Sequence, residues 1–170
     1  MRSYKAAVIT CSDRAAADVY EDRSGPVLRD ALANLGFEVE AAVIVPDNEE
    51  RITAEIERAI EDGARVVMTT GGTGVSPRDV TVEATLGLVD YELPGLMEEV
   101  RRRGAENTDK SLLSRGIAGV ISHPGHPRAL VINAPGSRGG ARDTIAVVGS
   151  LLDHIVGQLD GADHEMDEGS

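Results

Sequence analysis

The sequence predicts a single α/β domain, in which helices cover both faces of a mostly parallel sheet that also contains an antiparallel strand pair. Short apolar runs alternate with segments of helical periodicity between residues 5 and 159, which is typical of parallel strands connected by helices. The length of 170 residues suits one domain with a buried core. No linker, repeat or low-complexity block interrupts the pattern before an acidic end. We therefore expect a domain over residues 1–160 and a disordered tail over residues 161–170.

The first part of the chain is expected to form two strands with a helix between them. Residues 5–10 (KAAVIT) are an apolar run typical of a buried strand. The helix that follows should have Ser24 as its N-cap, Pro26 in its first turn and Gly36 as its stop. Residues 38–45 (EVEAAVIV) then predict the second strand.

The remaining elements follow from the same patterns. Residues 48–62 carry apolar side chains on one face, as an amphipathic helix does, and residues 65–70 (RVVMTT) form a third strand. The tight HPGHP connection joins residues 118–122 to residues 129–134, which predicts two strands paired antiparallel. Apolar residues recurring every three or four positions over residues 141–159 predict a long closing helix.

Composition and charge exclude several classes of protein. The formal charge of −12 argues against a general nucleic-acid surface, which needs a basic stripe. No apolar run approaches the roughly 20 residues of a membrane span, and the N-terminus lacks the apolar core of a signal peptide, so we expect a cytoplasmic protein. The single cysteine, Cys11, cannot form an internal disulfide or a cysteine-rich zinc site, and its place in a buried strand predicts an inert thiol.

A glycine-rich loop over residues 69–85 (TTGGTGVSPRDVTVEAT) follows the third strand. It is not a Walker phosphate loop, since no Gly-Lys pair occurs in the chain. Pro77 replaces the last glycine of the dinucleotide fingerprint, and Arg78 replaces the last glycine of a hydrolase nucleophile elbow. The glycines alone predict a tight strand-to-helix turn.

Each strand is followed by small or acidic residues, and the carboxyl ends of parallel strands share one edge of the sheet. Ser12 and Asp13 follow the first strand, Asp47 the second, the loop with Asp79 the third, and residues 135–140 (PGSRGG) the last. Ligands of open parallel sheets bind at this edge. Backbone N–H groups of a glycine-rich turn suit anionic oxygens, and nearby carboxylates suit Mg²⁺ between protein and phosphate. These residues predict a phosphorylated ligand bound with Mg²⁺.

The same sequence positions also have alternative explanations in which the side chains only stabilise the fold. Asp47 with Glu50 matches a capping box, and Asp79 stands where it could cap the helix after the loop. His123 and His126 are better explained by the turn between two strands than by a metal, since two ligands do not complete a coordination shell.

Five motifs resemble those of the MogA/MoaB family of molybdenum-cofactor biosynthesis proteins, which includes the G domain of gephyrin. They are SDR, VPDN, the long glycine-rich loop, LSRGIAGV and NAPGS, and the resemblance extends from about residue 5 to residue 159. The resemblance implies a homotrimer or hexamer that binds molybdopterin. Adenylyltransferase members transfer AMP from Mg-ATP to molybdopterin with release of pyrophosphate, and a molybdate-inserting enzyme takes over the product.

The resemblance also implies roles for individual residues. Asp47 and Asp79 match the aspartates tied to catalysis and would hold Mg²⁺ directly or through water, while Ser12 and Asp13 match the nucleotide side. The positions that match the substrate pocket are Gly71, Gly72, Thr73, Gly74, Ser114, Pro135, Gly136 and Ser137.

The chain departs from the family after the PGS turn. A basic residue often stands two positions after this turn, but here Arg138 follows it directly and Gly139 comes next. Our hypothesis is that Arg138, or Arg142 one turn later, supplies the positive charge at the substrate pocket.

Two functions from different classes follow from the resemblance. The first is an active molybdopterin adenylyltransferase with ATP as co-substrate. The second is a non-catalytic molybdopterin carrier of the MoaB branch, and an assembly scaffold is a third alternative. Asp47 and Asp79 favour the enzyme, since binding an anion gains little from adjacent carboxylates.

Overall fold

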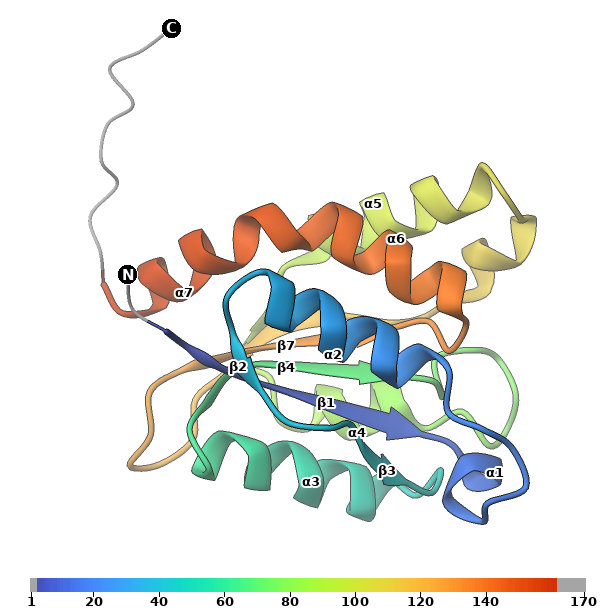
Figure 1. Cartoon of the computed structure of the whole chain (residues 1–170), viewed down its shortest axis with the longest axis horizontal. Helices are drawn as coiled ribbons and strands as arrows, with labels where there is room; N and C mark the ends of the chain where they lie inside the picture. The colour runs from blue at the N-terminus through green and yellow to red at the C-terminus, as the bar shows by residue number, and fades with distance from the viewer. Residues whose placement is uncertain (1–2, 162–170) are drawn as a thin grey trace, which may run out of the picture.

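A seven-stranded mixed sheet forms the centre of the computed structural model, which describes residues 3–161 (Figure 1). The strands are β1 (Lys5–Cys11), β2 (Glu38–Val39), β3 (Val43–Val45), β4 (Ala64–Thr70), β5 (Tyr91–Glu92), β6 (Ala118–Ile121) and β7 (Ala129–Ala134). Their order is β2-β1-β4-β7-β6-β5, and β3 also pairs with β1. Strands β2, β3, β4 and β7 join the sheet through parallel pairs, whereas β6 runs antiparallel to β7 and to β5. The predicted mixed sheet and its antiparallel pair are confirmed.

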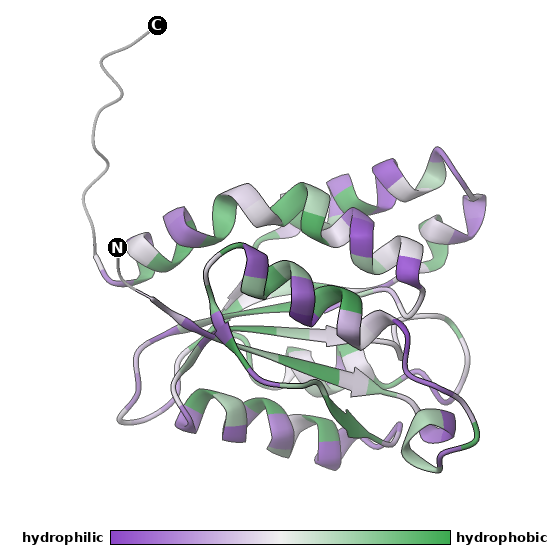
Figure 2. Ribbon diagram, in the orientation of Figure 1, coloured by the Kyte–Doolittle hydropathy of each residue, from purple (hydrophilic) through white to green (hydrophobic). Residues whose placement is uncertain are grey.

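Helices cover both faces of the sheet, as predicted. Their bounds are α1 (Asp13–Ala16), α2 (Ser24–Asn34), α3 (Glu49–Glu61), α4 (Thr81–Leu86), α5 (Pro94–Ala105), η1 (Asp109–Leu113), α6 (Arg138–Val148), η2 (Gly149–Leu151) and α7 (Leu152–Leu159). Helices α2, α5, α6 and α7 lie on one face, and α3 and α4 on the other (Figure 1). Hydrophobic residues of these helices turn toward the sheet, as Figure 2 shows. Among the described helices, none has the length and apolar character of a membrane span.

Alternating side chains of the central strands build two cores. Val66 and Met68 of β4 contribute to the core under α2, α5, α6 and α7, whereas Val67, between them, contributes to the core under α3 and α4. All three are fully buried. This is the period of two that a strand covered on both faces requires.

The predicted second strand, residues 38–45, is two strands instead of one. Ala6 pairs with Val39 and Ile9 pairs with Val43, so the outer segment has one more residue than the matching part of β1. An extra residue interrupts the ladder as a bulge does, and pairing resumes only at Val43.

Two predictions about the helices are wrong, one about the N-cap of α2 and one about the continuity of the closing helix. Ser24 is the first residue of α2 and not its N-cap; its hydroxyl accepts a hydrogen bond from Thr70, while the Asp22 carboxylate accepts from the Gly25 amide. The closing helix is interrupted by η2 between α6 and α7. The predicted stop at Gly36 agrees with its φ of +96°, a conformation that glycine adopts without strain. Of the expected acidic tail, only Gly161 lies within the described residues.

Candidate functional site

Two adjoining cavities open where the parallel strands end. The larger, here the large cavity, has a volume of about 510 Å³, and the smaller, here the small cavity, about 230 Å³. Gly72, Asp79 and Gly136 line both of them. The structure therefore joins the ends of β4 and β7 with the loop of Asp79 at one edge of the sheet, where ligands of such sheets bind.

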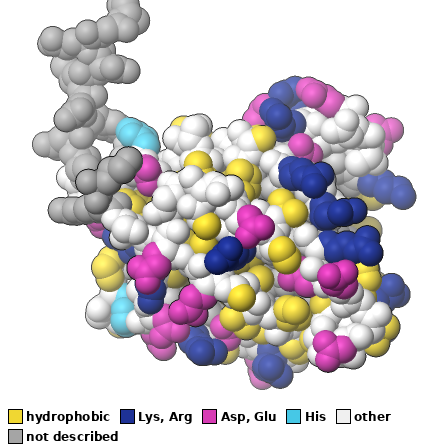
Figure 3. Space-filling view, viewed as in Figure 1, with side chains coloured by type: hydrophobic (Ala, Val, Ile, Leu, Met, Phe, Trp, Pro, Cys, Tyr) yellow, Lys and Arg dark blue, Asp and Glu magenta, His cyan; other side chains and the backbone are white. Residues whose placement is uncertain are grey.

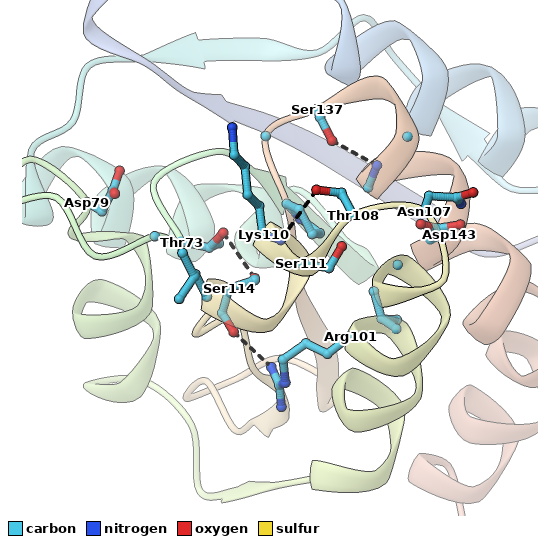
Figure 4. A pocket seen from close by; sticks show the side chains of 18 of the residues that line it. Thr73, Asp79, Arg101, Asn107, Thr108, Lys110, Ser111, Ser114, Ser137 and Asp143 are labelled. Carbon is cyan, nitrogen blue, oxygen red and sulfur yellow. Dashed lines mark hydrogen bonds between the residues drawn. The ribbon is translucent and has the colours of Figure 1, made fainter.

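The residues singled out from the sequence divide between these cavities. Ser12, Asp47 and Gly71 line the small cavity. The other predicted pocket residues line the large cavity (Figure 4); they are Thr73, Gly74, Ser114, Pro135 and Ser137. The site residues predicted from the sequence thus lie around one connected space, with Asp13 and Arg138 outside its lining.

Asp47 is bound to Asp13 by a reciprocal pair of hydrogen bonds. The Asp13 amide donates to Asp47 Oδ2 at 3.1 Å, and the Asp47 amide donates to Asp13 Oδ1 at 2.9 Å. The expected capping role of Asp47 is wrong, because Asn48 Oδ1 accepts from the Arg51 amide and is the N-cap of α3. The second oxygen, Asp47 Oδ1, is buried without a hydrogen-bond partner among the described residues. Asp47, which lines the small cavity, therefore keeps one hydrogen-bond acceptor without a partner among the described residues.

Burial raises the pKa of the half-buried Asp47 carboxyl, and the negative charges of Asp13 and Asp79 raise the pKa further. An unpaired buried oxygen and two neighbouring carboxylates are an unfavourable arrangement for folding. A divalent cation would relieve it, since Mg²⁺ in proteins is held by one or two carboxylates together with water and phosphate oxygens. The donor set fits Mg²⁺ in this shared form. It does not form a complete protein cage, because residues 3–161 contain no group of three or more His, Cys, Asp or Glu placed to hold a metal.

The pKa of Asp47 predicts a pH-dependent effect on stability. A carboxyl whose pKa is higher in the folded than in the unfolded state destabilises the fold when it is ionised. This penalty appears as the pH rises from the pKa of the unfolded state through the pKa of the folded state. We expect Asp47→Asn to raise the free energy of unfolding at pH 7 by at most about 1 kcal/mol, because water screens a half-buried charge. The gain should vanish near pH 3. Thermal melts at both pH values test this, with Asp30→Asn on the exposed face of α2 as control; equal gains in both variants would contradict the prediction.

Asp79 is held by its own loop. Asp79 Oδ2 accepts from the Ser76 amide at 3.0 Å, and the Asp79 amide donates to the Ser76 carbonyl at 2.9 Å. The expected capping role is wrong, since α4 begins at Thr81 and its N-cap, Val80, makes no side-chain cap. The loop turns back on itself and leaves the Asp79 carboxylate between the two cavities.

Arg115, the residue after Ser114 of the large cavity, binds this loop through several hydrogen bonds. Its Nε donates to the Gly74 carbonyl at 2.8 Å and its Nη2 to the Asp79 carbonyl at 3.1 Å, while Nη1 pairs with Glu83. The Arg115 amide donates to the Thr73 carbonyl at 2.8 Å. No pattern in the sequence gives Arg115 this role, although the LSRG motif contains it, because its partners lie more than 30 residues away in the chain.

Helix α5 and η1 supply a side of the large cavity that was not predicted from the sequence. Arg101 donates to the Gly116 carbonyl at 2.9 Å, so its charge is engaged with the backbone. Lys110 extends from η1 toward the loops that carry Asp79 and Ser137 (Figure 4). Pro94 in the first turn of α5 and basic residues in its last turn were the signals that could have identified this helix.

The N-terminal turn of α6 closes the large cavity. Ser137 is its N-cap and accepts from the Gly140 amide at 2.9 Å. Gly139 and Gly140 line the cavity without side chains, so the backbone of the first turn is accessible. Arg138 and Arg142 are exposed on α6 and line neither cavity.

Of the residues without a predicted functional role, Cys11 lines the small cavity, whereas His123 and His126 line neither cavity. Cys11 is buried, and burial raises its pKa to about 12, in agreement with an inert thiol. His123 Nε2 lies 3.1 Å from Glu61 Oε1, and the rings of His123 and His126 are 5.4 Å apart in the β6–β7 turn.

Comparison with known proteins gives the family. The profile described as "Probable molybdopterin binding domain" matches residues 7–154. The chain is 38% identical over 159 residues to the molybdenum cofactor biosynthesis bifunctional protein of Synechococcus elongatus, covering 94% of this chain and 48% of that protein. It therefore spans about half the length of this relative.

Two further relatives match over nearly their whole length. The chain is 36% identical to the molybdopterin adenylyltransferase of Pyrococcus furiosus, covering 91% of this chain and 90% of that one. It is also 36% identical to the crystal structure of the molybdopterin biosynthesis enzyme MoaB from Thermus thermophilus, with a TM-score of 0.82 and coverage of 93% and 97%. With these matches over most of its length, the chain belongs to the MogA/MoaB family of molybdopterin-binding proteins.

Proposed function

We propose that the protein is a molybdopterin adenylyltransferase of molybdenum cofactor biosynthesis. The observation that carries the proposal is the meeting of the two cavities at Gly72, Asp79 and Gly136. A transfer between two phosphorylated substrates needs both phosphates at one point, and holding them there is the larger part of catalysis. Each cavity would take one substrate, and Asp79 lies where their reacting groups would meet.

Molybdopterin is assigned to the large cavity. A terminal phosphate suits the first turn of α6, where Gly139 and Gly140 leave the backbone accessible and the helix dipole favours an anion. Lys110 lies in the lining of the same cavity and would add a positive charge. The pterin would extend away from this phosphate toward Arg101 and Ser114.

ATP with Mg²⁺ is assigned to the small cavity, beside Ser12 and Asp47. Asp47 and Asp79 would hold the cation, directly or through water, and Asp13 would position Asp47 through their paired hydrogen bonds. Mg²⁺ bound there would supply positive charge that offsets the carboxylates and the negative phosphate oxygens.

The reaction is a displacement at phosphorus. An oxygen of the terminal molybdopterin phosphate attacks the α-phosphorus of ATP and forms a new P–O bond, while the bond to the β-phosphate oxygen breaks and pyrophosphate leaves. The protein needs to align these groups and to stabilise negative charge, with no covalent intermediate. The product is adenylylated molybdopterin, which a molybdate-inserting enzyme would consume.

Lys110→Ala is expected to weaken molybdopterin binding by about 10-fold, since a charge-assisted contact with phosphate is lost. Arg138→Ala and Arg142→Ala test the alternative from the sequence, that a residue of α6 supplies this charge. Because Arg138 and Arg142 line neither cavity, we expect smaller losses from them. Binding titrations at low salt compare the three variants. A loss confined to Arg138→Ala would contradict the assignment of Lys110.

Arg115→Ala is expected to lower turnover by about 10-fold or more, because the backbone of Gly74 and Asp79 loses the guanidinium that holds it. Arg115→Lys should restore little of the turnover, since one ammonium group cannot make the several hydrogen bonds of a planar guanidinium. Steady-state assays should show a loss in kcat that exceeds the change in KM. Arg102→Ala, which removes exposed pairs with Glu99 and Glu106, is the matched control. Equal activity in the two alanine variants would contradict the role of Arg115.

Purified protein incubated with molybdopterin, ATP and Mg²⁺ tests the proposed function through pyrophosphate release. Release should require all three components. Tight molybdopterin binding without pyrophosphate release would favour the non-catalytic carrier. We also expect a homotrimer or hexamer, which sedimentation of the full chain tests.

A further inference from the structure

The connection between α1 and α2 borders the small cavity and contributes two side chains to it, Tyr20 and Arg23. The chain has few aromatic residues, with three tyrosines, one phenylalanine and no tryptophan. One of these few, Tyr20, is 52% exposed. Among the described residues that line the two cavities, Tyr20 is the one aromatic residue. An aromatic face exposed at a polar cavity is suited to stack on a planar ligand.

The connection is anchored at both ends, so that its backbone has a defined path beside the small cavity. After α1, the Val19 amide donates to the Arg14 carbonyl at 2.9 Å, and Asp18 adopts a left-handed conformation with φ of +55°. Before α2, Asp22 accepts from Thr10 Oγ1 at 2.8 Å and from the Gly25 amide at 3.0 Å. Tyr20 and Arg23 flank the anchored Asp22 and are therefore presented to the cavity by hydrogen-bonded segments.

Arg23 is the basic residue of the small cavity, whose other charged residues are Asp22, Asp47 and Asp79. Within residues 3–161 the exposed Arg23 side chain forms no hydrogen bond or ion pair. Lys and Arg side chains gather on the surface at the end of the molecule where α2 and α6 begin (Figure 3). An uncommitted guanidinium beside carboxylates suits a phosphate chain, which it can bind with two parallel hydrogen bonds.

We propose that Tyr20 and Arg23 form the nucleotide-binding side of the small cavity, with Tyr20 stacking on the nucleobase of ATP and Arg23 pairing with its phosphates. This inference rests on the proposed adenylyl transfer and specifies the residues that select its nucleotide. The Arg23 guanidinium would then neutralise part of the charge of the phosphate chain, in addition to the charge supplied by the Mg²⁺ that Asp47 and Asp79 would hold. The base lies toward the α1–α2 connection, and the α-phosphorus lies toward Asp79, where the cavities meet.

Isothermal titration with Mg-ATP and with Mg-tripolyphosphate separates the two contacts, because tripolyphosphate has the charge of the nucleotide without a base. Tyr20→Ala should weaken Mg-ATP binding by about 10-fold, the effect of one lost stacking contact, and leave tripolyphosphate binding unchanged. Tyr20→Phe should bind Mg-ATP as the wild type does. Arg23→Ala should weaken both ligands by about 10-fold, and the loss should shrink at high salt.

Matched controls remove residues of the same types elsewhere on the surface. Tyr91→Ala changes a tyrosine on β5 that is 47% exposed, and Arg29→Ala changes an arginine on α2 that pairs with Asp30. Both should bind Mg-ATP as the wild type does. If the wild type binds Mg-ATP while Tyr20→Ala and Arg23→Ala bind it equally well, the inference is overturned and the adenylyl transfer stands. A wild type that binds no Mg-ATP overturns both.

Discussion

Replacing both Asp47 and Asp79 by asparagine is expected to lower adenylyl transfer by at least about 10³-fold, the scale of losing a principal electrostatic contribution at a transition state. Both side chains border the small cavity, and the charge of Asp79 contributes to the raised pKa of Asp47, so they act on one region. Each single variant should therefore lose nearly as much as the double variant, because residues that act as a unit are not additive. The assay is formation of the AMP ester of molybdopterin at saturating Mg²⁺.

Stability separates this loss from unfolding. Asp47→Asn should be slightly more stable than the wild type at pH 7, since it removes a half-buried ionised carboxyl whose pKa is raised. A variant that is more stable and inactive is the pattern expected of a functional residue that folding alone would not favour. Asp30→Asn should keep full activity. Activity that survives in the double variant would contradict the role of both aspartates.

Gly71→Ala is expected to destabilise the fold by about 3 kcal/mol or more, because it combines a steric collision with a strained backbone. A Cβ atom at Gly71 would lie 2.4 Å from the carbonyl oxygen of Cys11, and its φ is +89°. The neighbouring residues Thr10 and Thr70 are paired in the β1–β4 ladder, so the two backbones cannot separate without breaking the centre of the sheet. Urea unfolding measures the change.

Gly95→Ala is the matched control for Gly71→Ala. A Cβ atom at Gly95 meets no atom within 4 Å, and Gly95 lies in the first turn of α5. Alanine should be neutral or stabilising there, because it restricts the unfolded chain and suits a helix. Equal stability in the Gly71→Ala and Gly95→Ala variants would contradict the close approach of β1 and the glycine-rich loop.

The sequence predicted the elements whose apolar pattern is strong. The β4 strand, the antiparallel β6 and β7, and helix α3 with its isoleucines all lie where periodicity indicated. Helix α5 was missed because most of its residues are charged or small, and only Met97, Val100 and Gly104 are buried. Lys110 and the side of the large cavity that α5 and η1 supply were therefore not predicted either.

Local rules were least reliable where several capping residues stand together. Asp47 and Asn48 both suit an N-cap, and only the extended backbone of Asn48, with φ of −135° and ψ of 123°, makes it the cap. Asp47 is thereby free to bond to Asp13, a residue 34 positions away, and no local pattern contains that pairing. The same holds for Arg115 and the loop of Asp79.

Transfer of label from ATP tests the central proposal, that the two cavities bring molybdopterin and ATP together at Asp79. Protein with molybdopterin, Mg²⁺ and ATP labelled at the α-phosphorus should yield a labelled pterin product in equal amount to pyrophosphate. ATP labelled at the γ-phosphorus should place its label in pyrophosphate alone. Label that stays in ATP while both molybdopterin and Mg-ATP are bound would contradict adenylyl transfer and leave the protein as a carrier.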